Sequence, residues 1–210
     1  MRSYLAELLG AFFLVFAVLC AGPVSPVLTA VCVATVLAVC VWVGAHVSGG
    51  HFNPAVTLGV YLRGGMSSLD LLSYWAAQLA GALLASVVAM TVLPDTGSPV
   101  VADATRLAPL GVVELVFSFA LVYVVLSIGT SRRQEHNVFL GVTCGVAVLA
   151  GMLAASVPAS GLSIGAFNPA VAFGVSVDGA VDWPTAALYV AAELLGGGAA
   201  AAFLGRTQPA

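Results

Sequence analysis

The chain has 210 residues, of which 61% are apolar and only 7% are charged, with a formal net charge of −3. A typical soluble domain contains roughly 25% charged residues, so six arginines and nine acidic residues cannot cover an ordinary cytosolic enzyme of this size. A disordered chain is polar rather than apolar, and nucleic-acid binding needs a basic run that this sequence lacks. The composition therefore indicates an integral membrane protein.

Six stretches are long and apolar enough for spanning helices, which need about 20 residues each. In chain order they cover residues 4–22, 27–47, 69–93, 110–128, 138–157 and 184–204. No segment between them could hold a soluble domain, so the sequence predicts one all-α membrane domain over residues 1–210. The first stretch is interpreted as a retained helix rather than a signal peptide, because Glu7 interrupts its apolar run and Leu19 is too large for a cleavage site.

The distribution of arginine predicts the orientation of the chain, because cytoplasmic loops are enriched in Lys and Arg. With the N-terminus inside, five of the six arginines face the cytoplasm: Arg2, Arg63, Arg132, Arg133 and Arg206. Only Arg106 then faces outward. We therefore expect a multi-pass protein of the cell membrane with both termini in the cytoplasm.

The chain contains an internal repeat. Segment 48–60, SGGHFNPAVTLGV, is identical to segment 163–175, SIGAFNPAVAFGV, at nine of thirteen positions. At the same spacing, YWAAQL at 74–79 aligns with YVAAEL at 189–194. At a different spacing, Glu7-Leu8 resembles Glu114-Leu115. Each copy, about 1–93 and 108–210 with the linker 94–107 between them, holds three spanning stretches. Because three is odd, the second copy is inverted in the membrane, which places a site at the midplane between the copies.

The central repeated element is the tripeptide Asn-Pro-Ala, formed by Asn53, Pro54 and Ala55 and again by Asn168, Pro169 and Ala170. Asn is a favoured helix N-cap and Pro is favoured at the first helical position, so each tripeptide predicts a helix start. The apolar stretches that follow end near residues 62 and 177, too early to cross a membrane. A single Asn-Pro would be only a loop breaker, but two matched copies predict opposed half-helices.

Two half-helices that meet at the midplane favour a pore that excludes cations. Each N-terminus carries roughly +0.5 charge, which repels hydronium. We expect each asparagine oxygen to cap its own helix while its NH2 group points into the lumen and binds a passing water. Backbone carbonyls before each tripeptide are expected to line the pore: those of Gly49, Gly50, His51, Ser163, Ile164 and Gly165. His51 is expected to anchor its turn rather than to gate the pore.

On these motifs the sequence resembles the major intrinsic protein family, the aquaporins and glycerol facilitators. SGGHFNPAVTLG is similar to the motif of bacterial water channels. Glu7, Gln78 and Glu114 fall at positions where that family has its characteristic repeated residues. The resemblance covers essentially the whole chain. It implies six spanning helices plus two half-helices, a pore in each subunit and a homotetramer in the lipid bilayer. The sequence contains no phosphate loop, metal cluster or nucleophile–base arrangement, so we expect no enzymatic activity, cofactor or metal.

The sequence departs from the family at the outer constriction. Most members have Arg two residues after the second Pro, where this chain has Val171. The other constriction residues, carried over by spacing, are Val33, Ser156 and Gly165, whereas water-specific members have an aromatic residue and a His at the first two. An uncharged, wider constriction predicts passage of water together with glycerol, urea or ammonia. The alternative is a substitute charge from the 94–106 loop, for example from Arg106.

Three carboxylates lie inside apolar runs, where an ionisable group is functional or firmly paired: Glu7, Glu114 and Glu193. For the first two we favour a structural role, in which they accept hydrogen bonds from the backbone before each Asn-Pro-Ala. Relatives usually have an uncharged residue near Glu193, and the resemblance gives no account of it. An ion-coupled transporter that uses these carboxylates, or a closed junction protein, remains the alternative to a passive channel.

Overall fold

The computed structural model describes residues 1–93, 107–129, 139–156 and 164–208, and these form eight helices. The six longer helices are α1 (Arg2–Ala21), α2 (Pro26–Ser48), α4 (Ser68–Val92), α5 (Leu107–Gly129), α6 (Leu140–Ser156) and α8 (Trp183–Thr207). Two helices of nine residues each, α3 (Pro54–Leu62) and α7 (Pro169–Val177), begin at the prolines of the two tripeptides. The described ranges contain no strand, which confirms the all-α prediction.

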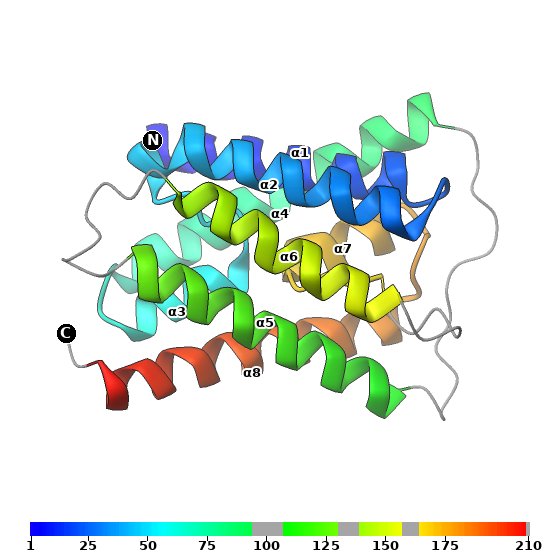
Figure 1. Cartoon of the computed structure of the whole chain (residues 1–210). Coiled ribbons are helices and arrows are strands. Elements are labelled where there is room, and N and C mark those ends of the chain that lie inside the picture. The colour runs from blue at the N-terminus through cyan, green and yellow to red at the C-terminus, as the bar shows by residue number, and fades with distance from the viewer. Residues whose placement is uncertain (94–106, 130–138, 157–163, 209–210) are drawn as a thin grey trace.

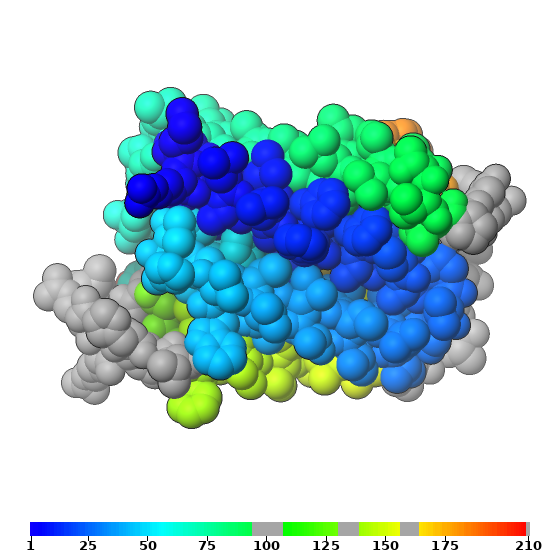
Figure 2. Space-filling model, turned by 90° about the horizontal axis from the view of Figure 1, so that it is seen from above, coloured from blue at the N-terminus to red at the C-terminus, as the bar shows by residue number. Residues whose placement is uncertain are grey.

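The outer surface of the bundle suits lipid rather than water. Five helices are long and apolar enough to cross a membrane, namely α1, α2, α4, α5 and α8, and α6 is a shorter apolar helix. Large apolar side chains stand exposed along them, and Trp42 on α2 is 71% exposed. Figure 2 shows the face that α1 and α2 form, flanked by α4 and α6. A soluble monomer rarely exposes so much apolar surface, so these side chains face the acyl chains of a bilayer.

The two repeats pack in the same way. In the first repeat α1 lies along α4, and in the second repeat α5 lies along α8. Helix α2 of the first repeat packs against α6 of the second, and this contact joins the two repeats. Close approach depends on glycine at equivalent positions. A Cβ on Gly81 would strike the backbone carbonyl oxygen of Leu8, and a Cβ on Gly196 would strike that of Leu115. The same contact therefore recurs in both halves.

The short helices enter from opposite ends. In Figure 1 the start of α1 and the end of α8 lie at one end of the bundle, with α3 toward that end and α7 toward the other. Each short helix packs against the last helix of the other repeat, α3 on α8 and α7 on α4. The inverted architecture with two half-helices, predicted from the odd number of spans in each repeat, is confirmed.

Candidate functional site

Each Asn-Pro-Ala tripeptide starts its helix by side-chain capping. The Oδ1 atom of Asn53 accepts a hydrogen bond from the backbone N–H of Ala55 at 2.8 Å. The Oδ1 atom of Asn168 accepts the equivalent bond from Ala170 at 3.0 Å. The proline of each tripeptide takes the first helical position, where an N–H would have no partner within the helix. Local sequence alone thus defines where both half-helices begin.

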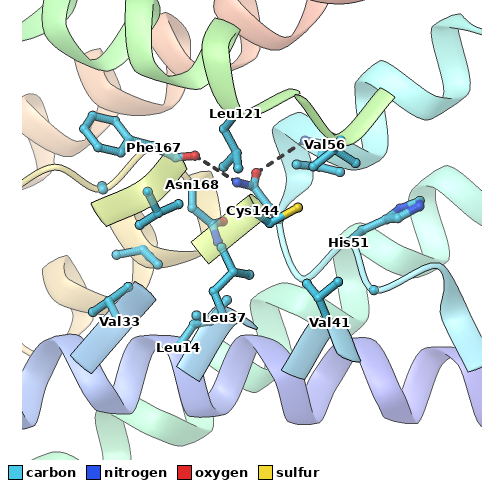
Figure 3. Close-up of a pocket in the computed structure, with 16 residues that line it drawn as sticks. Leu14, Val33, Leu37, Val41, His51, Val56, Leu121, Cys144, Phe167 and Asn168 are labelled. Carbon is cyan, nitrogen blue, oxygen red and sulfur yellow. Dashed lines mark hydrogen bonds between the residues drawn. The ribbon is translucent and has the colours of Figure 1, made fainter. Parts of the chain in front are cut away.

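The asparagine amides join the two tripeptides to each other. Nδ2 of Asn53 donates to the backbone carbonyl of Phe167 at 2.8 Å (Figure 3), and Nδ2 of Asn168 donates to that of Phe52 at 2.9 Å. These reciprocal bonds bring the helix N-termini together at the centre of the molecule. An amide NH2 carries two hydrogens, so each asparagine keeps one N–H for the cavity that it lines. The expectation that the whole NH2 group serves the lumen is corrected accordingly.

The accepting carbonyls belong to two residues held in the left-handed backbone region. Phe52 has φ 50° and Phe167 has φ 46°, and no other non-glycine residue of the described ranges has a positive φ. Such a conformation costs about 1–3 kcal/mol and persists where the surroundings fix it. Both rings are buried. Gly50 and Gly165, each with φ 66°, precede them by two residues and open the same turn. The turn aims each carbonyl at the opposite asparagine.

A buried carboxylate holds the backbone of each turn. Glu7 accepts from the N–H of His51 at 3.0 Å through Oε1 and from that of Phe52 at 2.6 Å through Oε2. Glu114 accepts from the N–H of Ala166 at 3.2 Å and from that of Phe167 at 2.8 Å. Both carboxyl groups are fully buried, and bonds to an ionised acceptor are stronger than neutral ones. These are the backbone bonds expected from the sequence.

The first turn has further side-chain support. Nε2 of Gln78 donates to Oε2 of Glu7 at 2.8 Å and to Oγ1 of Thr57 at 2.9 Å. Nδ1 of His51 lies 3.2 Å from the same hydroxyl oxygen, and its ring centroid lies 5.2 Å from that of Tyr74. His51 is therefore anchored on one side while it also borders the cavity.

A narrow cavity passes both asparagines. It offers about 30 Å³ to the centres of water-sized molecules, where a single water needs at least about 10–15 Å³. Val33, Leu37 and Val41 of α2 line one wall, and Leu121 of α5 and Cys144 of α6 lie across from them (Figure 3). No Arg, Lys, Asp or Glu among the described residues lines it. Apolar walls with a few amide and carbonyl groups suit water and small neutral molecules.

The predicted constriction residues are partly brought together. Val33 and Val171 both line this cavity. Gly165 lies in the turn before the second tripeptide, where its positive φ favours glycine. Ser156 is the last residue of α6, and its side chain lies outside the described part of the structure.

The expected carbonyl-bearing residues separate into three groups. Gly50 and His51 line the cavity. Gly49 instead ends α2 with φ 88°, and Gly49, Ile164 and Gly165 are not among the lining residues. Ser163 lies outside the described residues.

Two contacts of the site were not anticipated from the sequence. One is the pair of cross-repeat bonds to Phe52 and Phe167, although a Phe before both tripeptides was a visible signal. The other is Trp75, whose Nε1 donates to the carbonyl of Pro54 at 3.0 Å. The repeat gives no signal for this bond, because Val190 stands at the equivalent position.

Opposed half-helices, joined through asparagine amides beside a narrow apolar cavity, define a membrane channel built from an inverted repeat. A family model described as "Major intrinsic protein" matches residues 1–166. "Aquaporin TIP2-1" of Arabidopsis thaliana is 34% identical, covering 98% of this chain and 86% of the relative. "Aquaporin TIP1-2" of Zea mays is 37% identical, covering 86% and 70%. The chain therefore belongs to the major intrinsic protein family, a family of channels and not of enzymes.

The fold comparison agrees with this assignment. The X-ray structure of the aquaglyceroporin from Plasmodium falciparum matches with a TM-score of 0.77. The match covers 97% of this chain and 94% of that chain at 18% sequence identity. At this identity the likeness shows that the two chains share a fold.

Proposed function

We propose that the protein is a passive channel that conducts water and small neutral solutes through a pore in each subunit. The observation that carries this proposal is the cavity that passes Asn53 and Asn168, because two preorganised amide donors stand there between apolar walls. The aquaporin relatives support water as one permeant. Val171, at the position where most of the family have Arg, supports glycerol, urea or ammonia as others.

The half-helices supply the electrostatic barrier of this channel. The N-termini of α3 and α7 point at the centre, and each contributes roughly +0.5 charge. Two positive ends repel cations that approach from either side. Since no arginine of the described residues lines the cavity, exclusion of cations rests on the helix ends and the asparagine amides.

A solute panel in proteoliposomes tests the proposal. Stopped-flow light scattering is expected to show excess permeability over empty liposomes for water, glycerol and urea, with flux proportional to the gradient. Permeation of water alone would contradict the solute assignment. Saturable flux driven by a proton gradient would favour an ion-coupled transporter, and the absence of excess permeability would indicate a closed member of the family.

The channel is proposed to be a single unit of two repeats, about 1–93 and 108–210. Equivalent contacts of Glu7 and Glu114, and of Gly81 and Gly196, support this division. Most of the linker 94–107 lies outside the described residues. Co-expression of the two repeats as separate chains is expected to reconstitute water flux, because their contacts are noncovalent.

The protein is further proposed to be a homotetramer in the cell membrane with both termini cytoplasmic. Arg2 at the start of α1, Arg63 at the end of α3 and Arg206 in the last turn of α8 support this orientation through the positive-inside rule. Arg106, Arg132 and Arg133 lie outside the described residues. The tetramer rests on family membership. Reporter fusions to each terminus test the orientation, and native mass spectrometry tests the oligomeric state.

A further inference from the structure

The two repeats differ at one buried position beside the centre of the pore. Gln78 on α4 and Glu193 on α8 occupy equivalent places in the repeated YxAAxL segment. Gln78 donates to the carboxylate of Glu7 at 2.8 Å. Glu193 instead brings a second carboxyl group beside that of Glu114, because the two accept from the neighbouring backbone amides of Asn168 and Phe167. All four side chains are 0% exposed, so the second repeat has replaced a buried donor with a second acceptor.

Backbone amides of the second turn bond to both carboxyl groups. Glu114 accepts from two amides of the turn, and Oε1 of Glu193 accepts from the N–H of Asn168 at 2.9 Å. Oε2 of Glu193 meets no donor among the described residues. Two ionised carboxylates in contact repel each other, and a low dielectric enlarges the repulsion. A hydrogen bond between two carboxyl groups therefore needs a proton on one of them.

The described elements around the pair carry few titratable groups. Helix α8 packs against α5, α3 and α7. Besides the pair itself, the titratable residues on these helices are Tyr123 on α5, Tyr61 on α3, and Tyr189 and Arg206 on α8, whereas α7 and the turn 164–168 have none. Helix α6, which packs against α5, adds Cys144. Arg206 follows Glu193 by thirteen residues, about 20 Å along a helix. Glu114 accepts from the backbone amide next to that of Asn168 and is therefore the acidic side chain beside Glu193.

We propose that Glu114 and Glu193 form a proton-binding site, an acid–carboxylate pair that holds one proton and positions Asn168 at the centre of the pore. The shared proton takes the place that the amide of Gln78 has on Glu7 in the first repeat. Glu193 then still accepts the N–H of Asn168, whose side chain joins the two repeats. This assignment concerns the protein's own carboxyl groups and holds whichever solute passes.

The site makes stability depend on pH in a defined direction. At neutral pH the folded protein holds the shared proton, whereas a water-exposed glutamate of the unfolded chain has released it. The folded state therefore binds more protons, and its stability falls as pH rises. Removal of the proton leaves two charges in contact beside Asn168, which loosens the second turn.

Glu193→Gln tests the assignment, because it gives the second repeat the residue of the first. Infrared spectra of the purified protein in lipid are expected to show the C=O stretch of a protonated carboxyl at neutral pH, and the variant is expected to lose it. Thermal unfolding of the wild-type protein is expected to shift to lower Tm as pH rises, and the variant is expected to show a flatter slope. Neither measurement depends on solute flux, so this inference and the proposed channel function can fail separately.

Gln78→Glu is the reciprocal variant, since it places a second carboxyl group beside Glu7 and so builds a carboxyl pair in the first repeat. It is expected to add a second protonated-carboxyl band and to steepen the pH dependence of Tm. A wild-type spectrum without that band at neutral pH, or a band that persists in Glu193→Gln, overturns the proposal. Because the wild-type and Glu193→Gln spectra decide the assignment, the test does not depend on whether the Gln78→Glu chain folds.

Discussion

The side-chain amide of Asn53 donates a hydrogen bond of 2.8 Å to the backbone carbonyl of Phe167, 114 positions further along the chain. The reciprocal bond from Asn168 makes each half-helix depend on the turn of the other repeat. The centre of the pore is thus a property of the assembled pair and not of either repeat. Donors held in this way are already oriented when a permeant arrives, which is the condition for electrostatic selection without rearrangement.

Asn53→Asp is expected to increase proton leak through the channel. The substitution keeps an oxygen for the helix cap but replaces the donor to Phe167 with a negative charge that offsets the positive helix ends. A barrier lowered by about 1.4 kcal/mol corresponds to a tenfold higher rate. A pH-sensitive dye inside proteoliposomes measures the leak. Asn53→Ala removes the donor without adding charge, and an equal leak in both variants would contradict the electrostatic account.

Val171→Arg is expected to narrow the solute range toward water. The cavity at Val171 has no charged side chain among the described residues, and a guanidinium there adds both bulk and charge. Glycerol permeability is expected to fall by about tenfold more than water permeability, a difference of about 1.4 kcal/mol in barrier height. Val171→Leu adds bulk alone and separates the two effects. Equal losses for water and glycerol in Val171→Arg would argue against a filter at this position.

Glu7→Gln is expected to destabilise the first turn. The carboxylate accepts from the hydroxyl of Ser48 at 2.6 Å as well as from His51, Phe52 and Gln78, and an amide offers one acceptor atom in place of two. Loss of buried bonds to a charged group is expected to lower the free energy of unfolding by at least about 3 kcal/mol. Thermal unfolding in detergent measures the effect.

Ser73→Ala is the control for that measurement. Its hydroxyl bonds only the carbonyl of Leu69 on an exposed part of α4, so a change within about 0.5 kcal/mol is expected. A similar loss in Glu7→Gln and Ser73→Ala would mean that the buried carboxylate is dispensable.

Gly196→Ala and Gly198→Ala form a matched pair on α8. A Cβ at Gly196 would strike the carbonyl oxygen of Leu115, whereas at Gly198 the nearest atom would be Cδ1 of Leu62 at 3.8 Å. Gly196→Ala is therefore expected to separate α5 from α8 and lower Tm. Gly198→Ala is expected to be neutral or stabilising by up to about 1 kcal/mol from helix propensity. Equal Tm values for the two variants would refute the close-packing argument.

The sequence by itself determined the helices and their inverted arrangement. The length of each apolar stretch predicts the spanning helices. Each half-helix begins where Asn caps the helix and Pro takes its first position, which depends only on neighbouring residues, so α3 and α7 begin at Pro54 and Pro169 as predicted. The repeat also identified Glu7 and Glu114 as equivalent residues, and both accept backbone bonds before their tripeptides. These features depend on residues close in the chain or on a comparison of the two copies.

Only the tertiary structure decided what meets at the centre. Which carbonyl receives each asparagine amide, whether Val33 and Val171 share a cavity, and what Glu193 faces all depend on the relative placement of helices from different parts of the chain. A sequence pattern specifies which face of a helix is apolar, but not which atoms of a distant helix will lie against it. Close backbone contacts such as that of Gly196 with the carbonyl of Leu115 fix how near these helices lie, and this distance is set only in the packed structure.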